Sequence, residues 1–473
     1  MRPARAGGPA AASLLAAALA ACSHVPPHAL PVPPLSAAFA NQPADAASGE
    51  PAAQFWQRFQ DPELDALVAQ ALQANPDLRV AEANLREARA VSRLADAQQL
   101  PSVDVEASAG RQRARDYTGT PRTSSFYTAG FDVAWEADLF GRLGDARRAA
   151  AADVLASEAG LGFVHLTVSA EVARNYFELR GLQERLRVAQ AALRTQQQVL
   201  ELAAAREDAG RGTGFDTERA RALVATTAAS VPALEAALLR SRYRIAVLCG
   251  QPPTALDASL GEPRPLPGLR SVALGGIGSP EGLLRRRPDI RSAEMQVESA
   301  FARAGAARGD LFPHVTLGGT IGQNALTFGT LGDGASYAYS LGAQLAWNLL
   351  DFGRLRAQVA AADARGDAAL SSYEQTVLGA LEETEGALAT YTRSQRQAEL
   401  LFDAARAAEN AAAIARERFR VGVSDFLAVL DAEREELSAR DQLAQAQTAA
   451  ATSLVGVFKA LGGGWDDPAA SKG

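Results

Sequence analysis

Two stretches of this chain, residues 75–250 and 287–462, repeat one pattern at a constant spacing of 212 positions. Matched pairs include Pro76 and Pro288, Trp135 and Trp347, Arg206 and Arg418, and Gly210 and Gly422. Because the register holds without an insertion, the lengths of the elements are fixed, as they are in arrays and closed assemblies. We therefore expect function to come from architecture rather than from one reactive pocket.

The composition favours long helices. Alanine supplies much of the apolar fraction of 48%, whereas aromatic residues make up only 6%, a mixture typical of closely packed helices. The net charge of -7 comes from acids and bases intermixed along the chain, which gives no support for a nucleic-acid partner.

The N-terminus predicts export and lipidation. Residues 1–21 combine two arginines with an apolar run and read as a signal peptide. The following Leu19-Ala20-Ala21-Cys22 resembles the lipobox of bacterial lipoproteins, in which the cysteine is acylated after cleavage. Each buried acyl methylene contributes roughly 0.8 kcal/mol to membrane binding. The alternative is a coincidental cysteine near an ordinary cleavage site. We expect no other apolar run long enough to cross a bilayer as a helix.

Beyond the signal peptide, the pattern divides the chain into an N-terminal extension, two repeats, a linker and a tail. The predicted bounds are 22–60 for the extension, 61–250 for repeat 1, 251–280 for the linker, 281–462 for repeat 2 and 463–473 for the tail. Repeat 1 contains a β-hairpin at 101–140 and a helical hairpin at 143–250. Repeat 2 contains a β-hairpin at 313–352 and a helical hairpin at 354–462.

A twofold period begins after Pro101 and again after Pro313. Apolar and polar residues alternate in four runs of about ten residues, the length that a tilted membrane-spanning strand needs. Aromatic residues stand near both ends of the apolar faces, as in the girdles of outer-membrane barrels: Tyr127, Tyr337 and Tyr339 at one end, Trp135 and Trp347 at the other. The alternative is a soluble hairpin pair with both tryptophans in its core.

Nearly uninterrupted helical patterns follow, from Leu143 to about Asp208 and from Leu355 to about Arg420. At 1.5 Å per residue each helix is roughly 100 Å long, which indicates a coiled coil or helical array. Steps of four and three predict an a/d seam at Val188, Ala192, Thr195, Val199 and Leu202, and at Leu400, Ala404, Ala407, Ala411 and Ile414. A glycine turn ends each long helix, and a second helix returns.

Four strands cannot close a barrel, and an open edge in lipid would leave backbone groups without hydrogen bonds. The chain must therefore assemble. Two copies give eight strands, whose side chains largely fill the interior, whereas three copies give twelve strands and leave room for a lumen. The expected fold class is an α+β membrane protein, with a β-barrel that continues into a long α-helical barrel.

A set of short motifs spreads over nearly all of the chain after Cys22. These motifs are Phe55-Trp56, Asp61-Pro62-Glu63-Leu64, Asn75-Pro76-Asp77-Leu78, Arg286-Arg287-Pro288-Asp289-Ile290, the repeated Phe-Gly-Arg block at 140–142 and 352–354, and Arg418-Phe419-Arg420-Val421-Gly422. Together they resemble the outer membrane factor family of efflux lipoproteins. The resemblance implies a homotrimeric channel-tunnel with a twelve-stranded barrel in the outer membrane. It also implies a periplasmic adaptor and an inner-membrane resistance-nodulation-division pump as partners.

The resemblance also implies a gate at the second tip turn, where the family carries two acidic rings. The motif here reads Leu427-Ala428-Val429-Leu430-Asp431-Ala432. Asp431 matches one acidic position, but Ala428 occupies the other, which puts a two-ring aperture in doubt. Asp425 and Asp216 are candidates for the missing charge. The alternative is that these acids only stabilise helix N-termini, by roughly 0.3 to 1 kcal/mol each.

Two further sets of residues are candidates for function. Residues at the two tip turns are candidates for a contact with the adaptor: Arg206, Gly210, Gly212, Arg418, Gly422 and Ser424. The alternative for the glycines is a purely structural role in the turns. Acidic residues occupy the polar positions of the alternating strands: Asp104, Glu106, Asp132, Glu136 and Asp138. If these positions face a lumen, the acids would make it selective for cations. The alternative is that they form salt bridges.

The sequence gives little support for a catalytic or metal-binding site. There is no Walker A, GxSxG or HExxH pattern, and the four histidines are scattered. We therefore expect no enzyme, no metal site, and no cofactor beyond the lipid on Cys22. The main hypothesis is a passive efflux conduit. Its rivals are the outer component of a type I secretion or metal-efflux system, and a periplasmic coiled-coil scaffold without a lumen.

Overall fold

The computed structural model describes residues 30–43, 49–51, 54–115, 118–266 and 276–463. The predicted signal peptide and Cys22 lie outside these residues. The chain forms two compact units. One, here called the sheet unit, contains Asn84–Glu158 and Ser292–Glu374. The other, the helical unit, contains Val32–Ala83, Ala159–Arg291 and the chain from Gln375 onward.

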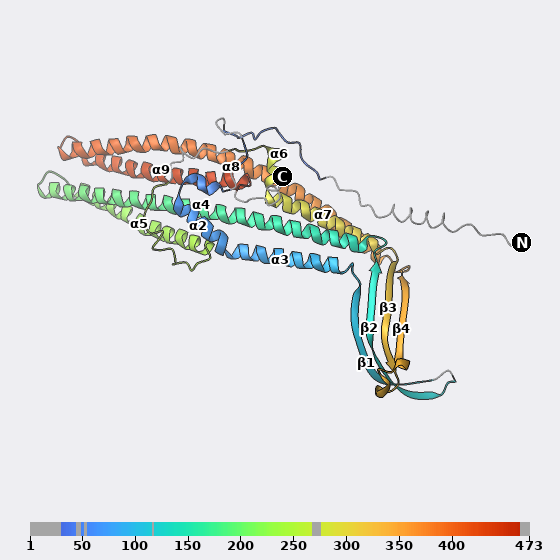
Figure 1. The fold of residues 1–473 in the computed structure, drawn as a ribbon. Coiled ribbons are helices and arrows are strands. Elements are labelled where there is room, and N and C mark those ends of the chain that lie inside the picture. Colours follow the sequence, from blue (N-terminus) through green and yellow to red (C-terminus); the bar gives the residue numbers. More distant parts are fainter. Residues whose placement is uncertain (1–29, 44–48, 52–53, 116–117, 267–275, 464–473) are drawn as a thin grey trace. The chain divides into compact units, whose positions relative to one another are not determined.

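The sheet unit carries one antiparallel sheet with the strand order β1-β2-β3-β4 (Figure 1). The strands are β1 Ser102–Arg115, β2 Pro121–Ala137, β3 His314–Ala325 and β4 Tyr337–Ala346. Val103 pairs with Val133 in the first hairpin, and their counterparts 212 positions on, Val315 and Leu345, pair in the second. The four predicted strands are therefore confirmed, and both repeats use the same register. Two short 3-10 turns, η2 Phe328–Thr330 and η3 Gly334–Ser336, precede β4.

The helices obey the same repeat. The two long helices, α4 Arg142–Asp208 and α8 Arg354–Arg420, each have 67 residues, and the returning helices, α5 Gly214–Leu248 and α9 Phe426–Ala460, each have 35. The helices before the strands, α3 Pro76–Ala97 and α7 Pro288–Gly309, each have 22. Shorter elements are η1 Phe55–Phe59, α2 Pro62–Ala74 and α6 Pro280–Arg286.

Equivalent hydrogen bonds hold each repeat together. The Nδ2 of Asn75, just before α3, donates to the carbonyl oxygen of Leu248 at 2.8 Å. In the second repeat an Nη of Arg287 donates to the carbonyl oxygen of Ala460, also at 2.8 Å. Because the last carbonyls of a helix have no partner within it, these buried side chains tie the end of each returning helix to the start of the helix that leads to the strands.

The core of the helical unit contains a cluster of aromatic residues. Phe55, Trp56 and Phe59 of η1 are buried. All three belong to the predicted N-terminal extension, 22–60, which was placed outside the two repeats. The Phe55 ring stacks on Phe458 of α9 with centroids 5.3 Å apart, and Phe59 lies 4.6 Å from Phe177 of α4. Such pairs contribute about 0.5 to 1.5 kcal/mol beyond the burial of their area. The end of the extension is therefore part of the core.

Two expectations about the long helices are corrected. The predicted seam is buried at Val188 of α4, but in α8 its members Leu400 and Ile414 are exposed. Instead, the buried residues Ala405 and Ala408 of α8 pack against α9. These residues lie one position beyond the predicted seam residues, so the chosen face was rotated by one residue.

The expectation that no helix is apolar enough to cross a bilayer is wrong by composition. Stretches of α4 and α5 are long and apolar enough to cross a membrane, by length and composition only. Alanine supplies much of this apolar composition, and helices in the core of soluble proteins have the same length and composition. The assignment of a membrane-spanning segment therefore depends on the sheet.

Candidate functional site: membrane sheet and helical tip

One face of the sheet is apolar and exposed. Val105, Phe131, Ile321 and Tyr339 are aligned across the four strands by the pairing register and lie on this face. Val105 is 74% and Leu341 is 88% exposed. Large apolar surfaces of this kind mark contacts with lipid or protein. Because alternate residues of all four strands contribute to it over much of their length, this face fits lipid rather than a private core.

The opposite face is polar. Asp104, Asp132, Thr320 and Ser340 form one aligned row. Hydroxyl pairs tie the hairpins together at matched positions, Ser108 with Thr128 at 2.6 Å and Thr320 with Ser340 at 2.8 Å. Alternation of an apolar outer face with a polar inner face is the pattern of an outer-membrane barrel wall.

Aromatic residues lie at both ends of the apolar face. The indole Nε1 of Trp135 donates to the carbonyl oxygen of Gln99 at 2.9 Å, and that of Trp347 donates to Leu311 at 3.0 Å. Both tryptophans therefore stand where helix meets sheet. Tyr127 and Tyr339 lie eight positions from Trp135 and Trp347, about 26 Å along a strand, which matches an apolar band of about 25 Å. Tyr337 lies beside Tyr339, with ring centroids 6.2 Å apart.

The five acids predicted for a lumen have three kinds of surroundings. Asp104, Glu106 and Asp132 lie on the polar face, with Asp104 directly opposite Asp132. Glu136 contacts Arg142 at 2.8 Å and His314 at 3.1 Å. Asp138 lies beyond the end of β2, and its carboxylate accepts from the backbone N–H groups of residues 143 and 144 at the start of α4. Glu136 thus forms salt bridges, as the alternative reading of these acids expected, and Asp138 caps the start of α4.

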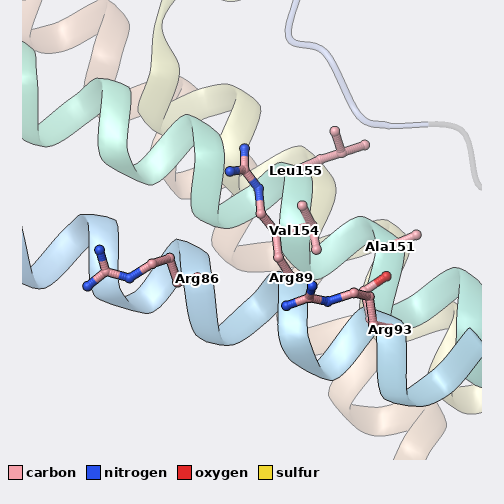
Figure 2. A pocket seen from close by; sticks show the side chains of 7 residues that line it. Arg86, Arg89, Arg93, Ala151, Val154 and Leu155 are labelled. Carbon is pink, nitrogen blue, oxygen red and sulfur yellow. The ribbon is translucent and has the colours of Figure 1, made fainter. Parts of the chain in front are cut away.

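A groove in the sheet unit was not foreseen. It lies between α3 and α4 and has a volume of about 640 Å³, and Figure 2 shows its arginines on α3 and its apolar residues on α4. The lining includes Arg86, Arg89, Arg93, Ala151, Val154 and Leu155. In the second repeat the counterpart of Arg89 is Phe301, whose ring packs against Gly366 of α8. The replacement of Phe301 by Arg89 between the two repeats was the sequence difference that could have pointed to the groove.

The two tip turns share one geometry. Gly210 and Gly422 have φ of 69° and 81°, the left-handed conformation that glycine tolerates. The next residue in each turn donates a 6→1 backbone hydrogen bond, Arg211 to the carbonyl of Arg206 at 2.8 Å and Val423 to that of Arg418 at 2.9 Å. This is a Schellman motif. The structural role considered for these two glycines is therefore present. Gly212, two residues later, does not have a positive φ.

Within one chain the two tips pack together. Phe419 and Phe426 of the second hairpin form a buried cluster with Ala203 of α4 and Leu223 of α5. An Nη of Arg206 donates to the carbonyl oxygen of Phe419 at 2.7 Å, and its guanidinium lies over the Phe419 ring. Arg206, predicted as an adaptor contact, thus joins the hairpins.

The other tip candidates remain accessible. Arg418 is exposed, and Ser424 is half-buried beside the second turn. The structure adds exposed apolar residues that sequence reasoning missed, at Phe215, Val421, Val423 and Leu427. Apolar residues inside a polar turn motif were the signal that could have identified them.

The three gate candidates differ in their surroundings. Asp431 of α9 is exposed. Asp425 caps α9, since its carboxylate accepts from the N–H of Ala428 at 3.0 Å. Asp216 is the repeat counterpart of Ala428, and its carboxylate accepts from the hydroxyl of Thr213 at 2.8 Å. The capping alternative therefore describes Asp425, and the gate role of Asp431 stays a prediction.

A buried acid next to the gate region was also missed. Glu433 is 3% exposed and pairs with Arg416 of α8 at 2.6 Å. Burial raises the pKa of Glu433, and the hydrogen bond from Arg416 opposes this rise. Glu436 contacts the same guanidinium at 3.1 Å. This cluster fastens α9 to α8 two residues beyond Asp431. Among the residues with described positions, no group of three or more His, Cys, Asp or Glu could hold a metal ion.

Comparison with known proteins agrees with this geometry. The sequence matches the family described as outer membrane efflux protein twice, over residues 67–251 and 280–463. The chain belongs to the outer membrane efflux protein family. The two matches coincide with the two repeats.

Relatives and solved structures extend over nearly the whole chain. The pyoverdine export outer membrane protein OpmQ of Pseudomonas putida is 33% identical over 459 residues, covering 95% of this chain and 96% of its own. Outer membrane protein OprJ of Pseudomonas aeruginosa is 32% identical, with 96% of each chain covered. The solved outer-membrane channel OprN has a TM-score of 0.89 and 40% identity, covering 94% of this chain and 100% of its own.

Membership in this efflux family confirms the predicted fold class, location and general function. The chain is an outer-membrane channel component of the efflux class, with β-strands for the membrane and long helices for the periplasm. The rival of a soluble hairpin pair with a private core is excluded, because the apolar face of the sheet is exposed and the relatives are outer-membrane proteins.

Proposed function

We propose that the chain is the passive outer conduit of a tripartite efflux pump, without catalysis of its own. The observation that carries this proposal is the sheet with an apolar outer face, a polar inner face and aromatic residues at both ends. A wall of this kind separates lipid from water. The relatives named for the export of pyoverdine and for solvent efflux support small molecules as the cargo.

Three copies would complete the wall. Both β1 and β4 are edge strands of the four-stranded sheet, and lipid cannot satisfy their free backbone groups. Twelve strands leave a lumen, whereas eight are largely filled by side chains. The assembled barrel and the ring of helical hairpins then form one duct.

The tips would meet a periplasmic adaptor, which connects the duct to an inner-membrane pump of the resistance-nodulation-division type. The supporting features are the exposed residues at the turns, with Arg418 for charge and Val421, Val423 and Phe215 for apolar contact. Exposed apolar residues at the free end of a protein suit a partner surface. Acylation of Cys22 would anchor the other end of the chain in the outer membrane.

Asp431 would form the constriction, as one acidic ring in the trimer. Asp431→Ala is expected to raise single-channel conductance in planar bilayers, because three carboxylates no longer face the axis. Asp431→Asn keeps the size of the side chain and separates charge from bulk. An unchanged conductance in both variants would place the constriction elsewhere.

The conduit itself can be tested with the purified lipoprotein. We expect trimers that resist heating in detergent, and discrete conductance steps in planar bilayers. A stable monomer without conductance would overturn the proposal and favour the scaffold. Loss of antibiotic resistance on deletion, restored by the gene but not by a pump gene alone, would tie the duct to efflux.

A further inference from the structure

We propose that a row of arginines on the first β-hairpin binds the phosphate groups of the glycolipid in the outer leaflet of the outer membrane. Arg111, Arg113 and Arg115 occupy every second position at the end of β1, and all three are exposed. β1 follows directly after α3, so the row lies at the end of the hairpin furthest from the helices (Figure 1). Because the long helices belong to the periplasm, this end faces the cell surface.

The arginine row continues the apolar face of the sheet. Val105 and Ala109 precede it at the same alternating positions of β1. The residue between Ala109 and Arg111 is Gly110, and the ring of Phe126 lies against it on the opposite face. The lipid-facing surface of one strand thus changes from apolar to basic over two residues.

A tyrosine marks the level of this change. Ala109 is paired with Tyr127, which stands at the outer end of the apolar band. Arg111 comes two positions later, about 7 Å along the strand, and Arg113 about 13 Å. Aromatic girdles in outer-membrane barrels stand at the interfaces of the membrane. The arginines therefore suit the depth of the headgroups, where a charged side chain does not enter hydrocarbon.

The row lacks a counter-charge within the described part of the chain. Arg111 is opposite Ser125 and Arg113 is opposite Thr123, and no described carboxylate forms an ion pair with either arginine. Neighbouring arginines in the row are about 7 Å apart along the strand, so their charges repel each other. A phosphate removes this repulsion and matches the planar guanidinium in bidentate geometry.

The second repeat shows that the hairpin does not need these arginines to fold. The counterparts 212 positions on are Gln323, Ala325 and Thr327. The side-chain oxygen of Gln323 accepts from the backbone N–H of Gly332 at 2.8 Å, a contact within its own hairpin. The first hairpin is also longer, with strands of 14 and 17 residues against 12 and 10. A basic row that only the longer hairpin carries is better explained by a ligand than by strand pairing.

The side of the membrane and the length of the row select the ligand. Phospholipids of the inner leaflet lie at the other end of the apolar band, beside the two tryptophans. The glycolipid of the outer leaflet carries several phosphate groups on its sugars, whereas a phospholipid headgroup carries one phosphodiester. The row spans about 13 Å from Arg111 to Arg115, which fits several phosphates better than one.

The test measures binding of purified lipopolysaccharide to the full lipoprotein in detergent, with a chelator present so that divalent cations do not bridge phosphates. Arg111→Gln with Arg113→Ala copies the residues of the second repeat and should weaken binding about tenfold. Arg115 is left in place, because it donates to the carbonyl oxygen of Gly119 at 2.8 Å. Heat-resistant assembly of the double variant, compared with the unmodified protein, checks its fold.

A matched pair of single variants separates position from charge. Arg113→Ala and Arg122→Ala remove the same charge from the same end of the hairpin, but Arg122 is paired with Ala114 and lies on the opposite face. Only Arg113→Ala should weaken binding. An equal loss in both variants, or unchanged binding in the double variant, would overturn the proposal.

Two lipid controls use the unmodified protein and do not depend on the fold of any variant. Lipopolysaccharide treated with a phosphatase should bind about tenfold more weakly, and phosphatidylglycerol should bind more weakly than intact lipopolysaccharide. Equal affinity for the dephosphorylated glycolipid would show that phosphate is not recognised. Equal affinity for phosphatidylglycerol would reduce the row to a general contact with anionic lipid and overturn the assignment to the glycolipid.

Discussion

Arg206 joins the two helical hairpins of one chain at their tips, so its replacement tests whether they move as one body. Its Nη lies 2.7 Å from the carbonyl oxygen of Phe419, and its Cζ lies 4.4 Å from the centroid of that ring. A hydrogen bond from a charged donor contributes about 1.5 to 3 kcal/mol, and an exposed cation–π contact about 0.5 to 1 kcal/mol. Because Arg206 is only half-buried, the lower ends apply, about 2 kcal/mol in total.

Arg206→Ala is therefore expected to raise the population of locally opened tips about 30-fold, since 1.4 kcal/mol corresponds to a factor of ten. Hydrogen exchange of the backbone amides in residues 415–430 measures this population directly. Arg211→Ala removes an exposed arginine from the same turn and serves as the control. Unchanged exchange in the Arg206 variant, or an equal rise in the control, would refute the reasoning.

Three further predictions follow from single contacts. Gly422→Ala should lower stability by about 1 kcal/mol, because alanine is strained at a φ of 81°, and a thermal melt in detergent checks this. Trp347→Phe should cost about 1 kcal/mol through loss of the Nε1 hydrogen bond; Trp135→Phe should cost the same, and unequal losses in denaturant titrations would contradict equivalent repeats. Burial lowers the pKa of His165 below 6.5, and Glu82 opposes this. The folded state favours the neutral ring, so stability should fall as the pH drops below 6.5 toward the lower folded pKa. His165→Gln should flatten that pH dependence in melts between pH 5 and pH 8 (about the range in which histidine titrates).

The sequence predicted those features that depend on local period and on the repeat. Alternation identified all four strands, and the two Trp residues were placed at one end of the apolar face, as observed. Glycine turns identified both tips, since a left-handed residue ends a helix. The acids were less predictable. Glu136 and Asp138 alternate in the sequence in phase with Asp132, so the pattern treats all three alike. Their partners, however, come from the start of α4 and from β3, and a sequence period does not show such contacts.

By itself the sequence determined the duplicated architecture, because period and element length are properties of consecutive residues. Only the tertiary structure decided which surfaces meet. It buried Arg180 beside Glu63, more than a hundred positions away, and it placed Arg206 on Phe419. Such choices depend on side chains from distant segments competing for one space, and a linear pattern does not contain that competition.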